Sequence, residues 1–198
     1  MNVIQVKCPA CSSPIYSKEK DRLFFCAKCN SIHVRDQSGG VERMDFEVAE
    51  FSQTAPQGER VYVPFWRLYS TFVIRSKSVE GGQLFRLAQW VKGNNDTGNM
   101  FIYVPATNMD PGSFKSLAIQ LTANPPRYST RLNFNSLRRM PAVVTRDEAV
   151  EMADFVVVTM EAEQPGTLQR LDYTLTVNDA KIVYLPFVLS PTGMYPGF

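Results

Sequence analysis

Four cysteines near the start of the chain carry its clearest chemistry. They form two pairs, Cys8 with Cys11 in "CPAC" and Cys26 with Cys29 in "CAKC", each with two intervening residues. A pair at this spacing can direct two thiolates at one ion from a tight turn, and two such turns complete the tetrahedral shell that Zn²⁺ prefers. The sequence therefore predicts one metal ion held by all four cysteines.

Disulfide bonds and unliganded thiols are the alternatives to a metal. No cysteine occurs after Cys29, so disulfides would leave most of the chain without a cross-link. The start, "MNVIQVKCPAC", has no basic stretch followed by an apolar one, so no secretory signal is expected. A reducing compartment keeps neighbouring thiols available as ligands, and we therefore favour a metal site and expect the cytoplasm.

The two knuckles resemble those of the zinc-ribbon family. "CPAC" matches the Cys-Pro-X-Cys form of the first knuckle, and "FFCAKC" matches the second together with its preceding aromatic residue. The family usually has glycine after the second cysteine, whereas this chain has Ser12 and Asn30. Asparagine tolerates the left-handed conformation better than serine, so the first knuckle is expected to differ slightly in shape. The resemblance covers residues 1–35 only and implies a small β-hairpin unit.

A complete set of four thiolates leaves no coordination position for a substrate water, which predicts a structural zinc. Iron in a rubredoxin-like electron carrier uses the same ligands, but such a carrier has no obvious need for the large domain attached here. Zinc ribbons serve in transcription, translation, nucleases and adaptor modules. The resemblance therefore predicts a metal and leaves the task open.

The chain has one histidine, His33, which excludes histidine-based triads, HExxH protease sites and zinc deaminase motifs. We expect His33 to be an ordinary polar residue at a strand end, because the four cysteines already complete a site. Glycine-rich phosphate and dinucleotide loops and a Gly-X-Ser-X-Gly elbow are also absent from the sequence. Acidic residues cluster at 36–60 and 147–163, where solvated surfaces are expected. An enzyme acting through carboxylates is therefore the least favoured function.

Composition predicts a small unit followed by a larger one. The chain has 198 residues, 44% of them hydrophobic, and contains no apolar run of the roughly 18 to 20 residues that would span a membrane. Residues 36–60 hold six acidic and two basic residues together with three glycines and a proline, which is typical of a connection. We predict a zinc ribbon at 1–35, an acidic linker at 36–60 and an α+β domain at 61–198.

The larger domain is predicted to be mostly antiparallel β with two helices. Strands are expected in "RVYVPFWRLYSTFVIRSKS", "QLFRLAQWVKG" and "MFIYVPA". Ser113 is expected to cap one helix, and Thr145 and Glu148 form the capping box of the other, although residues 155–160 also suit a strand. "LQRLDYTLTV", "ND" and "AKIVYLPFVL" predict a hairpin, and "SPTGMYPGF" a terminal tail.

A Tyr-X-Pro pattern recurs in "VYVPFW", "IYVPAT" and "VYLPFV". Because proline lacks the N–H that a central ladder needs, each run is expected to end, or to meet a sheet edge, at Pro64, Pro105 and Pro186. Chance recurrence among β-branched strands is the simpler explanation, and a duplicated structural unit is the other.

The favoured function is a non-enzymatic zinc-binding protein that acts as a protein-interaction or assembly module. Aromatic residues near the predicted strand ends are candidates for contact with a partner: Phe65, Trp66, Tyr195 and Phe198. For Phe65 and Trp66, core packing is the favoured explanation.

Nucleic-acid binding is the alternative function. Residues 1–35 carry six basic and two acidic residues, and 111–146 carry six basic and no acidic ones. Basic residues that suit phosphates interleave there with an aromatic one that suits bases: Arg127, Tyr128, Arg131, Arg138 and Arg139. Residues 147–198 hold eight acidic and two basic residues, and we expect the basic block to neutralise this segment instead.

Overall fold

The computed structural model of the chain describes residues 6–15, 21–35, 41–80, 97–162, 167–191 and 193–198. Its elements, in chain order, are β1 (Val6–Lys7), β2 (Pro14–Ile15), β3 (Leu23–Cys26), β4 (Ser31–Arg35), β5 (Val41–Met44), β6 (Phe46–Ala49), β7 (Glu59–Glu80), β8 (Thr97–Pro105), α2 (Pro111–Ala123), β9 (Thr130–Arg131), β10 (Arg138–Arg139), α3 (Arg146–Ala162), β11 (Thr167–Ser190) and β12 (Gly193–Pro196). The strand predicted in "QLFRLAQWVKG" falls outside the described residues.

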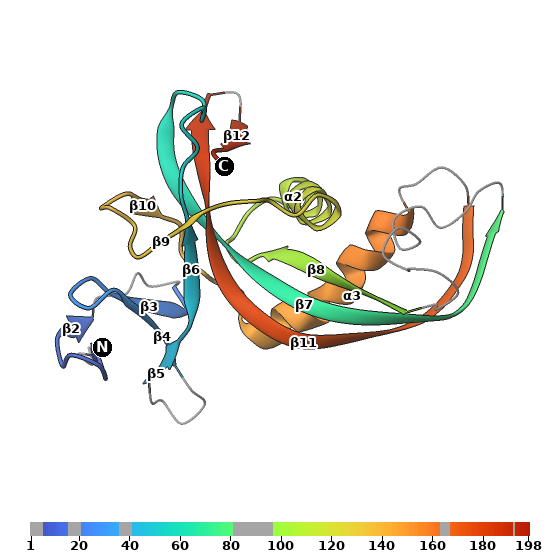
Figure 1. Ribbon diagram of the computed structural model, residues 1–198, viewed down its shortest axis with the longest axis horizontal. Helices are drawn as coiled ribbons and strands as arrows, with labels where there is room; N and C mark the ends of the chain where they lie inside the picture. The colour runs from blue at the N-terminus through green and yellow to red at the C-terminus, as the bar shows by residue number, and fades with distance from the viewer. Residues whose placement is uncertain (1–5, 16–20, 36–40, 81–96, 163–166, 192) are drawn as a thin grey trace.

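One long antiparallel pair, β7 with β11, organises the larger part of the structure (Figure 1). β10 and β8 pair with the outer edge of β7, β6 and β12 pair with the outer edge of β11, and β9 pairs with β6. The pair curves, with α2 within the curve and α3 running across the pair (Figure 1). Strands are mostly antiparallel, which confirms the predicted α+β class. Within the described ranges no helix is long and apolar enough to span a membrane.

The capping residues predicted from the sequence give the correct start for α3 and a slightly late start for α2. Thr145 and Glu148 form the predicted capping box at α3, with Thr145 N donating to Glu148 Oε2 (2.7 Å) and Glu148 N to Thr145 Oγ1 (3.3 Å). The helix includes residues 155–160, so the strand alternative is wrong. At α2 the cap is Asp110 and not Ser113, because Asp110 Oδ1 accepts from Ser113 N (2.9 Å).

The recurring prolines behave in two ways. Pro105 ends β8, but Pro64 and Pro186 lie inside β7 and β11, so these two runs do not end there and only the other expected outcome, a proline at a sheet edge, can apply. The Pro64 carbonyl accepts from Ala106 N and the Pro186 carbonyl from Gly197 N, both at 2.9 Å. The backbone nitrogen and carbonyl of each proline therefore face the outer edge of the pair. Pro64 lies between the ladders of β10 and β8, and Pro186 between those of β6 and β12. A missing N–H costs no ladder bond at such a gap.

The predicted hairpin at Asn178 and Asp179 is also wrong. β11 runs through both residues and keeps β7 as its partner, with a register shift between Val177 and Asp179. A β-bulge thus accommodates the irregularity, because the 22-residue partner strand offers continuous pairing that a two-residue turn would break. The C-terminal segment, expected to be a tail, forms β12 on β11.

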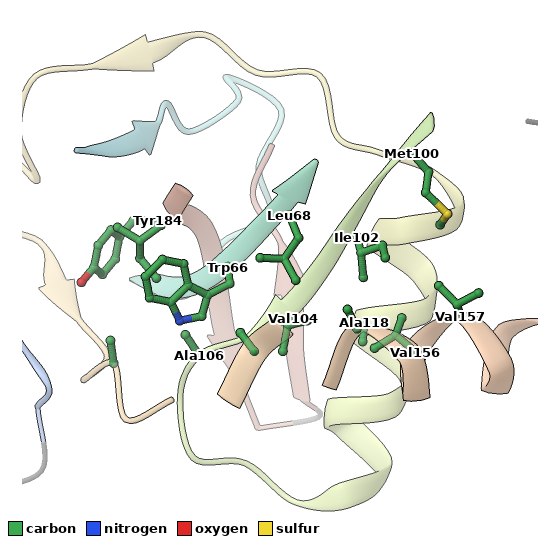
Figure 2. Close-up of a cluster of buried hydrophobic side chains, with 14 of the residues drawn as sticks. Trp66, Leu68, Met100, Ile102, Val104, Ala106, Ala118, Val156, Val157 and Tyr184 are labelled. Atoms are coloured by element: carbon green, nitrogen blue, oxygen red, sulfur yellow. The ribbon is translucent and has the colours of Figure 1, made fainter. Parts of the chain in front are cut away.

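The main core lies between the sheet and the helices. Trp66 and Leu68 of β7, Ile102 of β8, Ala118 of α2 and Val156 of α3 all point into it (Figure 2). Alternate residues of each strand face this core, as the period of two in a strand requires. Each large side chain buried there contributes about 1.5–3 kcal/mol.

The predicted acidic connection carries two strands. β5 pairs with β4 in the three-stranded β3–β5 sheet, whereas β6 pairs in parallel with β11 in the large sheet. Only Asp45 separates β5 from β6 along the chain. Leu23 and Ile32 belong to the same core cluster as Trp66. We refer to β1–β5 as the cysteine-bearing unit, and its β3–β5 sheet packs into the main core.

Candidate metal centre

Two tight turns direct the four cysteines at one point. In the first, Ser12 N donates to the Cys8 carbonyl and Cys8 N to the Ser13 carbonyl, both at 2.8 Å. Ser12 has φ 58° and Asn30, at the equivalent place in the second turn, has φ 49°. Both residues therefore adopt the left-handed conformation in which the resembling family usually has glycine, and serine makes the same turn as asparagine.

The four sulfur atoms all lie within 4.8 Å of one another. The Sγ atoms of Cys8 and Cys29 are 3.6 Å apart, as are those of Cys11 and Cys26. A tetrahedron with Zn–S bonds of about 2.3 Å has sulfurs about 3.8 Å apart, close to these distances. A disulfide needs about 2.05 Å, and all four cysteines are free thiols. The cluster could therefore hold a metal ion such as zinc.

Ser31 and His33 connect the two knuckles outside the ligand shell. Ser31 Oγ lies 2.9 Å from Cys29 Sγ and 2.7 Å from His33 Nε2, which is 3.3 Å from Cys8 Sγ. Both side chains are buried, and they occupy alternate positions of β4, so they face the same side. They fit the role of outer residues that orient metal-bound sulfurs.

The environments of the thiols differ. Hydrogen bonds from the Ser13 side chain and backbone lower the pKa of Cys11 to about 6. Burial raises the pKa of Cys8, but hydrogen bonds from Ser31 and the knuckle backbone outweigh it and bring the value below the usual range. Burial raises the pKa of Cys26 to about 11. The cluster thus contains thiols ready to ionise beside one that needs a cation to do so.

His33 is more than the isolated polar residue that the sequence suggested. It is fully buried, and burial, followed by the positive charge of Arg43, lowers its pKa and keeps the ring neutral at pH 7. A neutral ring can carry its proton on Nε2 and donate it towards Ser31 and Cys8. The sequence signal for this role was the spacing of Ser31 and His33, which places two side chains on one side of β4 directly after the second knuckle.

A buried ion pair joins the cysteine-bearing unit to the large domain. Asp21 Oδ2 lies 2.8 Å from Arg139 Nη1, and Asp21 Oδ1 accepts from Ala142 N at 3.0 Å. The Arg22 N–H donates to the Ala142 carbonyl at 2.7 Å. The Arg139 guanidinium lies 5.9 Å from the centre of the Phe25 ring. Polar and aromatic contacts thus fix the unit to the segment before α3.

The structure separates the residues of the predicted nucleic-acid surface. Arg138 pairs with Glu59 and Arg139 with Asp21, whereas Arg127 is exposed. The Tyr128 hydroxyl is bound within a cluster around Glu47 and Arg67, and Arg131 lies in β9. The expectation that the block pairs with residues 147–198 is therefore wrong for Arg138 and Arg139, whose carboxylate partners come from earlier in the chain.

The candidate partner-binding aromatic residues differ in how far they are exposed. Phe65 and Trp66 are buried in the core, as the favoured explanation for them predicted, so they offer no surface to a partner. Trp66 Nε1 donates to the Val144 carbonyl at 2.9 Å. Tyr195 is 43% exposed. The Phe198 ring packs edge-on against Phe187, with centroids 5.8 Å apart.

Carboxylates of α3 have structural contacts. Glu148 caps the helix, and Asp154 accepts a hydrogen bond from the Tyr173 hydroxyl of β11. These contacts hold helix and sheet together, and they do not bring two carboxylates to one cleft.

The fold and the cysteine cluster define an α+β protein with a four-sulfur site suited to a metal ion. Comparisons with protein-family models, with curated proteins and with solved structures find no match for this chain. The site geometry therefore carries the functional argument.

Proposed function

We propose that the protein is a non-enzymatic zinc-binding protein in which one structural Zn²⁺, held by Cys8, Cys11, Cys26 and Cys29, stabilises a module for protein interaction or assembly. The observation that carries the proposal is the closed set of four sulfurs within 4.8 Å. Four thiolates saturate a tetrahedral ion, so no open position is left for a reacting molecule. The thiolates require a reducing compartment, for which we propose the cytoplasm.

The attachment of the site supports a structural role. β3–β5 lie on the main core, and Asp21 pairs with Arg139 across the junction. A metal at the knuckles would then fix the remaining part of the unit, β1 and β2, relative to a surface that is already rigid. The zinc-ribbon resemblance of residues 1–35 agrees with this arrangement.

The interaction part of the proposal is supported by exposed apolar side chains on the sheet. Tyr69 and Phe101 are 38% and 40% exposed, and their ring centroids are 5.2 Å apart on the neighbouring strands β7 and β8. Val73, 39% exposed, lies on the same side of β7. Clustered exposed aromatics of this kind favour contact with another protein surface.

Two measurements test the proposal. Elemental analysis should give one zinc per chain, lost when Cys26 and Cys29 are both changed to Ser, and stoichiometric iron would contradict it. Sedimentation analysis should give a mass above the 22.4 kDa of one chain, returning to 22.4 kDa in a Tyr69→Ser, Phe101→Ser variant. A wild-type protein that stays at one chain would remove the self-assembly part.

Nucleic-acid binding has less support. It would need several free guanidinium groups on one surface, whereas Arg138 and Arg139 have carboxylate partners.

A further inference from the structure

A cavity of about 450 Å³ opens beside the large sheet. It lies between the connection from β6 to β7, the start of β7, and the segment that runs from β9 to β10. Its walls combine two arginines with a carboxylate, an amide and two apolar side chains: Glu50, Phe51, Arg60, Arg131, Asn135 and Leu137. The lining is mostly polar, and a concave space of this size with charged groups in its walls suits a small charged ligand.

The two arginines of this cavity differ from the other arginines that have ion pairs. In the described ranges, neither Arg60 nor Arg131 has a carboxylate at ion-pair distance, even though Glu50 lines the same space. The pairs that do form are Arg67 with Glu47, Arg138 with Glu59 and Arg139 with Asp21. Two guanidinium groups without an ion-pair partner among the described residues therefore line one cavity together with a single carboxylate, which leaves the lining with a net positive charge.

A buried donor at one wall also points to a missing acceptor. Among the described residues, Arg131 Nε has no hydrogen-bond partner. Burial raises the pKa of the neighbouring Tyr62, and contact with the Arg131 side chain opposes this effect, so the two groups are close to each other. Buried polar groups are nearly always paired, and an unpaired guanidinium at a cavity wall is suited to an anion.

The second guanidinium is held in place by an aromatic ring. The Arg60 Cζ lies 5.0 Å from the centre of the Phe51 ring. Stacking of this kind uses the face of the guanidinium and leaves its edge N–H groups free to donate. Arg60 therefore supplies an oriented donor rather than a freely moving charge.

We propose that this cavity binds the phosphate group of a small phosphate monoester, with Arg60 and Arg131 as its ligands. Phosphate is preferred over carboxylate because a monoester carries about −1.5 to −2 charges at pH 7, which matches two guanidinium groups, and offers three acceptor oxygens. The organic part of the ligand lies against Phe51 and Leu137. Glu50 accepts a hydrogen bond from a hydroxyl or amino group on it.

The test is a titration of the full-length protein with phenyl phosphate, followed through the arginine Nε–H resonances. We expect a saturable shift of the Arg131 signal, and an affinity weaker by about tenfold or more in Arg60→Gln and in Arg131→Gln. Arg138→Gln is the matched control, since it removes the same charge from an exposed pair, and it should bind like the wild type. Arg60 is exposed, so its variant keeps the test valid if Arg131→Gln does not fold.

Three results would overturn the proposal: no saturable shift up to about 10 mM phenyl phosphate, equal weakening by Arg60→Gln and Arg138→Gln, or benzoate binding as tightly as phenyl phosphate. A 5′-phosphorylated oligonucleotide, compared with its 5′-hydroxyl form, identifies the source of the phosphate. Tighter binding of the phosphorylated oligonucleotide than of phenyl phosphate supports a nucleic-acid end, and the reverse supports a small metabolite.

Discussion

The cysteine-bearing unit and the β7–β11 pair are both β structure, but different interactions hold them together. The strands of the unit have two to five residues, and among its described residues its own buried cluster consists of Cys8, Ile15, Phe24 and Cys26. β7 and β11 have 22 and 24 residues and lie on a core that includes residues from both helices. The difference predicts that hydrophobic burial suffices for the long pair and that the knuckles depend on a cross-link.

The boundary between the part stabilised by hydrophobic burial and the part expected to depend on a cross-link lies inside the cysteine-bearing unit. Leu23 and Ile32 of β3 and β4 belong to the main core, whereas β1 and β2 pair only with each other. Metal should therefore matter most for the knuckle half of the unit and least for the sheet that follows it.

Metal removal should have the largest effect on the stability of the knuckles relative to the large sheet, because a structural zinc contributes about 10–16 kcal/mol in small zinc-binding units. Chelation should remove hydrogen-exchange protection from β1 and β2 and leave the large sheet with one cooperative unfolding transition. Adding zinc back is the control and should restore protection. Unfolding of the whole chain on chelation would show that the unit and the large domain are one cooperative structure, against the division predicted at 36–60.

Breaking the ion pair between the regions should have the next largest effect. Asp21→Ala leaves Arg139 buried without its carboxylate, and the free energy of unfolding should fall by about 3–5 kcal/mol in denaturant titrations. Glu59→Gln is the matched control, because it removes the exposed partner of Arg138 and should cost about 0–1 kcal/mol. Equal losses in the two variants would mean that Asp21 does not link the regions.

Ser31→Ala should weaken metal binding without unfolding the large sheet. It removes the hydroxyl beside Cys29 Sγ and His33 Nε2, and loss of such an outer contact typically lowers metal affinity by about 10- to 100-fold. Competition with a chromophoric chelator measures the change, and Ser52→Ala, at a half-buried serine outside the unit, is the control. An affinity within twofold of the wild type would assign Ser31 a packing role only.

The smallest effect is expected from the exposed arginines. Arg127→Ala combined with Arg138→Ala should change the free energy of unfolding by about 1 kcal/mol or less, and single-stranded nucleic acid should bind weakly at every salt concentration. Fluorescence anisotropy over a salt series measures this. Sub-micromolar, salt-sensitive binding that the double variant reduces would instead support nucleic-acid recognition.

What the sequence predicted well was local. Two cysteines separated by two residues, or Thr145 and Glu148 three positions apart, determine a contact within one turn, so their geometry follows from spacing. The α+β class followed from alternating strands and two periodic helices. Ser31 was missed because hydroxyl residues are common in strands, and its role appears only when Cys8 and Cys29 are brought to its side of β4.

What the sequence could not predict depends on distant partners. The Asn178 and Asp179 pair forms a bulge because residues near Ser70, more than 100 positions earlier, supply a continuous ladder. The sequence left a surface role open for Phe65 because its stacking partner Phe187, with ring centroids 5.9 Å apart, lies far along the chain. Turn propensity and side-chain type give no information about such pairings.

The two internal prolines also bear on how the protein behaves at high concentration. An uninterrupted outer edge on a strand of more than 20 residues could recruit strands from other molecules and start aggregation. Pro64 and Pro186 face opposite outer edges of the pair, and each lacks the N–H that a recruited strand would need at that point. Short native strands fill the positions on either side of each proline. Around these two prolines, the longest strands of the molecule are therefore protected against edge-to-edge association.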